Sequence, residues 1–477
     1  MKKSLRNLLL ILFIFCIGSF NVYAVETDAD EIEIKQGQTL SLNDCIDIAV
    51  NNSHDIKIYE EYIKMYSSRV GQSKSSYFPT LGASVGYDYG NVDSKYRSAQ
   101  TKNTSARVSL NQLIYSFGKV FSQVKMQKFY KIAAEYDLQN EVLNLTNNVK
   151  SSYYGVLAAK ANVDIQKANV QVNERQYNRT KAFFDEGLVS KIDLVNQEVY
   201  LSDAKISLIN AENTYQTSIV KLNNAMHIHN IPDYQIENTE TFNFKNNYAE
   251  VNLLNIANNT TNADGTIKDA VLTTQVEKND ILDNYKFSKY PYSMQECIER
   301  AYKSHPDLLS MQATENAVRE ALKYTKKSYL PDLTGSVGYN WNNNNYYSSN
   351  GISLGAYLST SNLNIMETKL KVDESKAQLE IAKQNVEAIK CRVNYDVQEA
   401  YINMVQLEKN IPLMQTKVKQ TLENYELADA RYEVGLGNFI ELQDAKENYN
   451  NAQMDYVQTI YKYNIALTNL QTAMGEK

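Results

Sequence analysis

Two carboxylates, Glu441 and Asp444, follow closely after a break in an otherwise helical stretch of the sequence. The break reads "VGLGNF" over residues 434–439, with two glycines around one leucine. A spacing of three residues places both carboxylates on the same face of a helix. Residues 186–197, "EGLVSKIDLVNQ", have the same layout 248 positions earlier. Two such carboxylates could simply be solvated residues on a helix surface. Whether they have a function depends on the elements that position them.

Other residue patterns that could carry chemistry are weaker. The segment "GASVG" (82–86) has the spacing of a nucleophile elbow, but that motif needs a strand-to-helix turn, and strand-like sequence continues past it here. His227 and His229 could bind a metal ion, but no carboxylate cluster flanks them. No loop of the glycine-and-lysine type that cradles phosphate is present. We therefore expect no enzyme activity, no cofactor and no metal, and any energy that the protein needs must come from a partner.

The composition is that of a folded, exported protein rich in helix. The 477 residues include 36 Tyr but only 6 Pro and 17 Gly, and few breakers in so long a chain favour long helices. Residues 1–24 are predicted to be a signal peptide, because Lys2, Lys3 and Arg6 precede the apolar run 8–20. Removing these three positive charges changes the net charge from −6 to −9. This acidic balance argues against nucleic-acid binding.

The chain is a tandem duplication. The matching pairs of blocks are 41–50 with 293–302, 74–87 with 326–339, and 187–226 with 435–474. The second pair is identical at nine of fourteen positions, and the third pair aligns without a gap. Cys45 and Cys297 occupy equivalent places and are predicted to be small buried helix residues. The expected organisation is a signal peptide (1–24), a first repeat (25–228), a non-repeated insert in an equatorial position (229–290) and a second repeat (291–477).

Each copy begins with a predicted helix and continues with two predicted strands. A Ser-x-x-acid capping box at 41–44 or 293–296 begins the helix, and Pro79 or Pro331 ends it. Apolar or aromatic residues then alternate with small or polar ones, as in strands with one apolar face. The alternating residues are Leu81, Ala83, Val85, Tyr87, Tyr89, Val108 and Leu110 in the first copy, and Leu333, Gly335, Val337, Tyr339, Trp341, Ile352, Leu354, Ala356 and Leu358 in the second.

The two strands of each copy are predicted to form a hairpin. The polar segments 88–105 and 342–351 are expected to be the loops, which leaves strands of about ten residues, near the length that spans a bilayer.

Long helices are predicted after each hairpin. Residues 119–186 contain one Gly and no Pro, and a continuous helix of that size would be on the order of 100 Å long. After each glycine break, small and apolar residues return at the spacing of a coiled-coil seam. These residues are Leu201, Ala204, Leu208, Ala211, Tyr215, Ser218, Leu222 and Ala225, and in the second copy Tyr449, Ala452, Tyr456, Thr459, Tyr463, Ala466, Leu470 and Ala473. Each break is therefore predicted to be the tip of an antiparallel helical hairpin.

Four strands per chain leave two unpaired edges, whose backbone groups lipid cannot satisfy. Either the strands pack onto a soluble sheet, or several chains combine them into a closed barrel. The export signal and the aromatic strand ends at Tyr87, Tyr89, Tyr339 and Trp341 favour a barrel, because aromatic residues gather at membrane interfaces. Three chains would give twelve strands, although periodicity alone does not fix the number three.

The sequence resembles the TolC-like outer-membrane efflux proteins over nearly all of the mature chain except the insert. The resemblance is carried by the openings "LNDCIDIAVNNSHDI" and "MQECIERAYKSHPDL", the strands "FPTLGASVGY" and "LPDLTGSVGY", and the tip "RYEVGLGNFIELQDAKENYNNAQ". It implies a mainly α protein with a β-barrel portion: a homotrimer with a 12-stranded barrel in the outer membrane and a long α-barrel across the periplasm. It further implies a passive exit duct of an efflux or type I secretion system, which receives cargo from an inner-membrane pump and a periplasmic adaptor.

The resemblance also implies roles for residues at the helical tips. Tip residues dock the adaptor, and the matching positions here are Val434, Gly435, Leu436, Gly187 and Leu188. In the family, residues just past the tip form a ring around the closed pore entrance. The matching positions here are Glu441, Asp444, Asp193 and Asn196. Stacked rings of carboxylates attract cations and repel anions. Gly437 stands where the family often has a basic residue that helps to hold the tip closed.

A periplasmic coiled-coil adaptor or envelope scaffold without a pore is the alternative from another class. The strand hairpins discriminate between the two, because a scaffold has no need of alternating strands with aromatic ends. The sequence does not identify the cargo or the partner pump.

Overall fold

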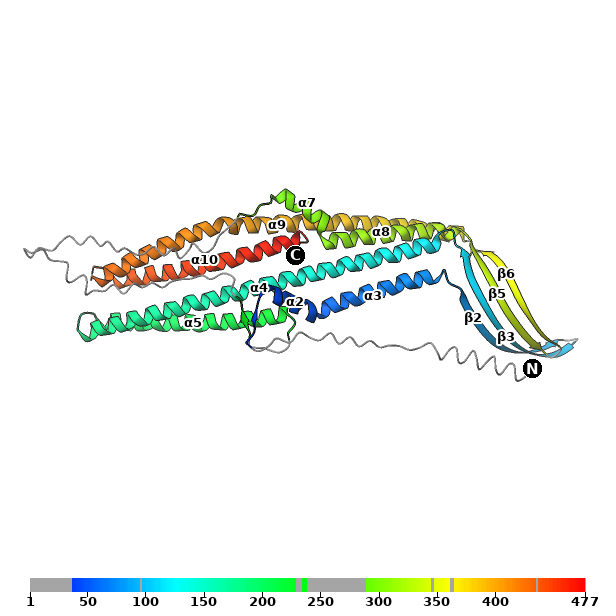
Figure 1. Cartoon of the computed structure of the whole chain (residues 1–477), viewed down its shortest axis with the longest axis horizontal. Coiled ribbons are helices and arrows are strands. Elements are labelled where there is room, and N and C mark those ends of the chain that lie inside the picture. The colour runs from blue at the N-terminus through cyan, green and yellow to red at the C-terminus, as the bar shows by residue number, and fades with distance from the viewer. Residues whose placement is uncertain are drawn as a thin grey trace, which may run out of the picture.

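The computed structural model describes residues 37–94, 97–228, 234–237, 289–344, 347–360, 364–434 and 436–476. The predicted signal peptide, most of the predicted insert and Gly435 lie outside the described residues. The chain is elongated, with two helical hairpins side by side and one sheet at the end opposite the helical tips (Figure 1).

The described elements follow the same order twice. The first set is β1 Thr39–Leu40, α2 Leu42–Asn52, α3 His54–Ser75, β2 Thr80–Ser94, β3 Arg97–Tyr115, α4 Lys119–Asp185, α5 Lys191–Ala225 and β4 Gln235–Ile236. The second set is α7 Met294–Ser304, α8 Pro306–Lys326, η1 Lys327–Tyr329, β5 Asp332–Asn344, β6 Ser348–Ser359, α9 Ile365–Glu433 and α10 Phe439–Ala473. The predicted capping boxes are confirmed at the starts of α2 and α7, where serine and the acid three residues later bond reciprocally.

The prediction of one helix from each capping box to the following proline is wrong, because each is divided in two. Ser53 takes an extended conformation with ψ 121°, and its hydroxyl accepts a hydrogen bond from the Ile56 N–H at 3.3 Å, so it begins α3 anew. In the second copy Pro306 begins α8. The helical conformation is disfavoured for a residue that precedes proline. His305 is accordingly extended, with ψ 117°.

The four long strands form a single antiparallel sheet in the order β2-β3-β5-β6. Both predicted hairpins are confirmed, but the predicted loops are wrong in extent. In the first hairpin the ladder continues through Asp88↔Asn103 to Ser94↔Arg97, and β2 and β3 have 15 and 19 residues. Backbone pairing does not require apolar side chains, so the polar segment extends the strands where the lost alternation suggested a loop.

The two faces of the sheet differ in chemistry. Directly paired residues share a face, so the registers define rows across all four strands. One face contains the rows Leu81–Leu110–Val337–Leu354 and Ala83–Val108–Tyr339–Ile352. The other contains Gly82–Ser109–Gly338–Ser353 and Ser84–Arg107–Asn340–Gly351. The sheet therefore has one apolar face and one face of small polar residues and Arg107.

The polar face is the crowded one. A Cβ added at Gly82 would lie 3.2 Å from the Ser109 hydroxyl, and one at Gly338 would lie 3.0 Å from that of Ser353. On the inner side of a curved sheet side chains converge, which accounts for the small residues there.

The long helices pack as two antiparallel pairs, as predicted. Helices α4 and α9 have 67 and 69 residues, so each is on the order of 100 Å long. Their partners α5 and α10 return along them. The predicted seam is buried throughout much of α10 and at fewer positions of α5. The buried seam residues are Ala452, Tyr456, Thr459, Tyr463, Ala466 and Leu470, and Ala204, Ala211, Leu222 and Ala225.

Two apolar cores lie midway along the helices. The first joins α2, α4 and α5 with the short β1–β4 pair, and the second joins α7, α9 and α10. Cys45 and Cys297 are fully buried in them, as predicted. The Tyr153 hydroxyl donates to the Glu237 carbonyl at 2.6 Å, so the described part of the predicted insert packs against α4 at mid-length.

Candidate functional site

The tip of the first helical hairpin is a glycine-capped turn. Gly187 has φ 74°, the left-handed conformation that favours glycine. Its N–H donates to the Phe184 carbonyl at 2.9 Å, and the Leu188 N–H donates to the Phe183 carbonyl at 2.8 Å. These two bonds define a Schellman cap, which satisfies the last carbonyls of α4. Leu188 projects outward and is 72% exposed.

The second tip turns back more tightly against the end of α9. The N–H groups of Leu436 and Gly437 both donate to the Arg431 carbonyl, at 2.9 and 2.8 Å. A Cβ at Gly437 would lie 2.7 Å from the backbone nitrogen of Tyr432, so no side chain fits at this position. This explains why glycine stands where a basic residue was expected. Val434 and Leu436 are 66% and 76% exposed.

Glu441 and Asp444 lie in the first turns of α10, and both are exposed on one face. The residues between and after them, Leu442, Gln443 and Ala445, are buried. The Glu441 carboxylate accepts a hydrogen bond from Arg431 of its own hairpin at 3.2 Å. Among the described side chains, no cation lies within ion-pairing distance of Asp444. Of the two carboxylates, Asp444 therefore has the less compensated charge.

In the first copy Asp193 has a local structural role. Its carboxylate accepts hydrogen bonds from the Ser190 N–H at 3.1 Å and the Ser190 hydroxyl at 2.6 Å, in a capping box at the start of α5. The sequence contains the signal for this, because Ser190-x-x-Asp193 is the same motif that begins α2 and α7. Asn196, the equivalent of Asp444, is exposed and neutral.

Buried amides join the two copies just inside the tips. The side-chain N–H of Gln443 donates to Gln197 at 3.0 Å and to Gln176 at 3.2 Å, which connects α10 with α5 and α4. The structure therefore brings the candidate gate residues of both copies to the same end of the molecule.

A buried lysine belongs to this group of amides. Lys446 is 8% exposed and donates to the Asn173 side-chain oxygen at 2.6 Å and to Gln176 at 3.4 Å. Burial lowers the pKa of Lys446 from its ordinary 10.5 to about 8.

Arg179, near the end of α4, connects the two copies through charge, and the sequence analysis missed it. Its guanidinium lies 3.3 Å from the Glu433 carboxylate and 3.9 Å from that of Asp429, both on α9. It also lies over the ring of Tyr432 at 5.4 Å from the centroid. No sequence signal could pair residues 254 positions apart. Position 437 cannot hold a basic side chain, and Arg179 places a positive charge between the two hairpins instead.

Aromatic residues lie toward one end of the apolar face of the sheet. Tyr87 and Tyr89 are 64% and 56% exposed on that face. Trp341 pairs with Ala106 and Asn350, in the last row before Thr104 and Asn343 make the face polar. Tyr339 lies one row further in, between Val108 and Ile352, and so within the apolar band.

A second aromatic group lies at the other end of the sheet, where it meets the helices. Its exposed members are Tyr77, Phe78, Tyr115 and Phe117. The rings of Tyr115 and Phe117 are 4.7 Å apart in an edge-to-face arrangement. The apolar band is thus bordered by aromatic side chains at both ends. None of the described helices combines the length and apolar character that crossing a membrane requires.

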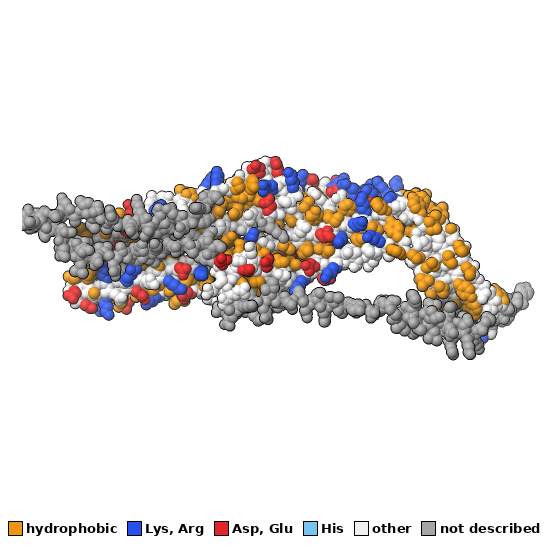
Figure 2. Space-filling view, in the orientation of Figure 1, with side chains coloured by type: hydrophobic (Ala, Val, Ile, Leu, Met, Phe, Trp, Pro, Cys, Tyr) orange, Lys and Arg blue, Asp and Glu red, His pale blue; other side chains and the backbone are white. Residues whose placement is uncertain are grey.

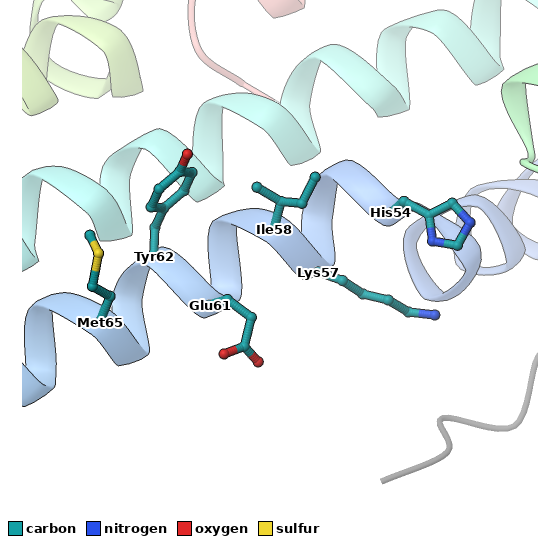
Figure 3. Close-up of a pocket in the computed structure, with 6 residues that line it drawn as sticks. All are labelled: His54, Lys57, Ile58, Glu61, Tyr62 and Met65. Atoms are coloured by element: carbon teal, nitrogen blue, oxygen red, sulfur yellow. The ribbon is translucent and has the colours of Figure 1, made fainter. Parts of the chain in front are cut away.

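A shallow open pocket of about 600 Å³ lies on α3 (Figure 3). Its six lining residues all belong to this one helix: His54, Lys57, Ile58, Glu61, Tyr62 and Met65. Ile58 and Tyr62 are 50% and 47% exposed, so the pocket is an uncovered helix face.

A sheet with one apolar, aromatic-bordered face, joined to long helical hairpins with exposed apolar tips, defines the class of outer-membrane channel subunits. The family model "Outer membrane efflux protein" matches residues 45–226 and 297–476. The outer membrane protein TolC of Escherichia coli K12 is 21% identical over 423 residues, covering 85% of this chain and 76% of TolC. TolC of Vibrio cholerae is 22% identical over 419 residues, covering 84% of each chain.

Solved structures agree on the fold. The structure of CusC aligns with a TM-score of 0.72 at 14% identity, covering 94% of this chain and 96% of CusC. The open state of the MtrE outer-membrane channel of Neisseria gonorrhoeae aligns with a TM-score of 0.67 at 14% identity, covering 91% of this chain and 89% of MtrE. The chain belongs to the outer membrane efflux protein family. It is an efflux channel of the outer membrane that extends into the periplasm, and the alternative of a scaffold without a pore has no support.

Proposed function

We propose that three copies of this chain form one closed duct, and that the duct opens at its helical tips when a periplasmic adaptor and an inner-membrane pump dock there. The chain itself conducts passively. The domain boundaries 25–228, 229–290 and 291–477 remain part of this proposal.

The observation that carries the proposal is the sheet. Its edge strands β2 and β6 each pair on one side only within the described chain, with β3 and β5, and one face of the sheet is apolar. Pairing β6 of one copy with β2 of the next would satisfy both edges, and three copies would give twelve strands. Leu354 and Ile352 of β6 are 81% and 77% exposed, as expected for side chains that face lipid.

The uncovered helix faces support the same assembly. Ile58 and Tyr62 on α3, and Ile192, Val199 and Ile209 on α5, are apolar and largely exposed in the single chain. Contiguous exposed apolar faces of this kind are typical of subunit interfaces. We therefore assign these faces to contacts between copies.

We assign the gate to Glu441 and Asp444, with Asp193 and Asn196 as their counterparts in the first copy. Three copies would place six exposed α10 carboxylates around the entrance, of which the Asp444 charges are the less compensated. We assign adaptor docking to the exposed apolar tip residues and the glycines that position them. These are Val434, Gly435, Leu436, Gly187 and Leu188.

Single-channel conductance in a planar bilayer tests the duct and the gate together. The purified wild type is compared with Glu441→Ala/Asp444→Ala, and with Glu387→Ala/Glu399→Ala, at exposed positions of α9 away from the tip, as a control of equal charge. We expect small, cation-selective openings whose selectivity is lost in the gate variant only, because the carboxylate rings set the field at the entrance. Equal selectivity in all three proteins would contradict the gate assignment, and no conductance from folded wild type would contradict the duct.

A further inference from the structure

The helix ends next to the sheet carry a strong excess of positive charge. We define this region, the basic collar, as residues 69–79, 116–131, 319–332 and 364–376. It contains thirteen Lys or Arg against five Asp or Glu, a net charge of +8 in a chain whose total is −6. Figure 2 shows Lys and Arg side chains gathered over the ends of α8 and α9, beside the hydrophobic surface of the sheet.

Four lysines of the basic collar are exposed and form no close ion pair, although Lys369 acts on the Asp373 carboxylate at longer range. Lys74, Lys128, Lys326 and Lys369 come from α3, α4, α8 and α9, one from each helix. Among the described residues, no carboxylate lies within ion-pairing distance of any of them. In contrast, Lys119 and Lys371 are paired with Asp332 and Glu367 at 2.8 and 2.6 Å.

The helix dipole accounts for only part of this arrangement. Lys74 and Lys326 lie in the last turns of their helices, where a positive charge is favourable. Lys369 lies near the start of α9, where the dipole disfavours a cation, and α4 has no acidic residue in its first turn. The helix dipole therefore does not account for the positive charge at the starts of α4 and α9.

The position of the basic collar indicates a negative partner from outside the chain. The collar begins where the second aromatic group ends the apolar band: Lys74 precedes Tyr77 by three residues, and Lys119 follows Phe117 by two. If the apolar face lies in lipid, as proposed above, the aromatic residues occupy the membrane interface. The lysines then lie at the level of the phosphate groups on the periplasmic side.

We infer that the basic collar binds the head groups of anionic phospholipids in the periplasmic leaflet of the outer membrane. Each unpaired ammonium offers a compact charge with three donors to a lipid phosphate. Basic residues next to a membrane segment attract anionic lipid in this way, within about one Debye length. This inference rests on the proposed position of the sheet in the membrane.

Spin-labelled lipids test the inference in vesicles that contain the purified protein. The label is on phosphatidylglycerol or on phosphatidylcholine, and the motionally restricted fraction of each gives their relative association with the protein. The test variant is Lys74→Gln/Lys128→Gln/Lys326→Gln/Lys369→Gln. The control, Lys181→Gln/Lys191→Gln/Lys221→Gln/Lys462→Gln, removes equal charge from exposed positions away from the sheet.

We expect wild type and control to prefer phosphatidylglycerol by about three- to fivefold at low salt, and the test variant to show almost no preference. The preference should fall toward one in 1 M salt, where the Debye length is only about 3 Å. A quadruple Lys→Arg variant should keep it. Absence of a preference in wild type, its persistence in the test variant or its loss in the Arg variant would each overturn the inference.

Conductance of the same vesicles separates this inference from the proposed function. A wild type that conducts but shows no lipid preference would overturn only the inference about the basic collar. A wild type that does not conduct overturns the duct. Wild-type conductance in the test variant shows that its loss of preference is not caused by misfolding.

Discussion

Removing the Arg179 side chain should open the channel without any partner. Arg179→Met keeps an aliphatic stem but deletes the ion pairs of Arg179 with Glu433 and Asp429, which connect α4 with α9. The matched control is Arg431→Met, which deletes an equal charge at the same tip. Arg431 pairs with Glu441 at 3.2 Å within one hairpin, so its loss leaves the contact between the copies intact.

The size of the effect follows from the contacts of Arg179. Its side chain is 27% exposed and that of Glu433 is 38% exposed, so after screening by solvent the ion pair contributes up to about 1 kcal/mol. The stacking of the guanidinium on Tyr432 adds about 0.5–1 kcal/mol. A loss of about 1.5–2 kcal/mol per chain corresponds to roughly a 10- to 30-fold shift toward the open state.

Open probability in a planar bilayer measures this shift. We expect frequent, larger openings of Arg179→Met, an intermediate result for Arg179→Lys, and behaviour close to wild type for Arg431→Met. The reasoning is refuted if Arg179→Met stays closed, or if Arg431→Met opens to the same degree.

Three further predictions concern stability, two of them near the tips and one midway along α4. Because folding lowers the pKa of Lys446 to about 8 while the unfolded chain keeps about 10.4, the unfolded state binds more protons between these values. Stability should therefore rise by up to about 3 kcal/mol from pH 8 to 10.4, and Lys446→Met should flatten this rise in thermal melts. Gly437→Ala should cost about 1–3 kcal/mol because its Cβ meets backbone, detected as faster hydrogen exchange at the tip. Gly155→Ala, inside α4 with open space around it, should instead stabilise by about 0.5–1 kcal/mol in the same melts.

Local signals predicted most of the element types. The capping boxes, the period-two alternation and the long breaker-poor segments each reflect interactions within a few residues, and the duplication provided every signal twice. The division of the first helix at Ser53 was missed because serine within a helical pattern is a weak signal. Pro306 in the second copy is a stronger signal, and the prediction of one helix up to Pro331 overlooked it. The loop at 88–105 was wrong because polar side chains do not prevent backbone pairing.

The candidate site was less predictable because its contacts are not local. Glu441 and Asp444 could be placed on one exposed face from their spacing alone. The buried amides around Lys446 and the contacts of Arg179 depend on how α4 packs beside α9 and α10. No periodicity in a single sequence specifies those pairings.

Under the gate proposed above, the two copies contribute unequal charge, because their tips have diverged. In the first copy Asp193 is held by Ser190 in a capping box, and Asn196 is neutral, so the two equivalent positions carry one carboxylate instead of two. In the second copy Asn438 caps α10 by accepting from the Ile440 N–H at 3.0 Å, without using the acid three residues later. Glu441 therefore has no capping role; it pairs with Arg431 at 3.2 Å and lies on the same exposed face as Asp444. Because α9 is the helix that Arg179 restrains, movement of the second hairpin would release the restraint and displace the carboxylates together, which couples opening to the loss of the charged ring.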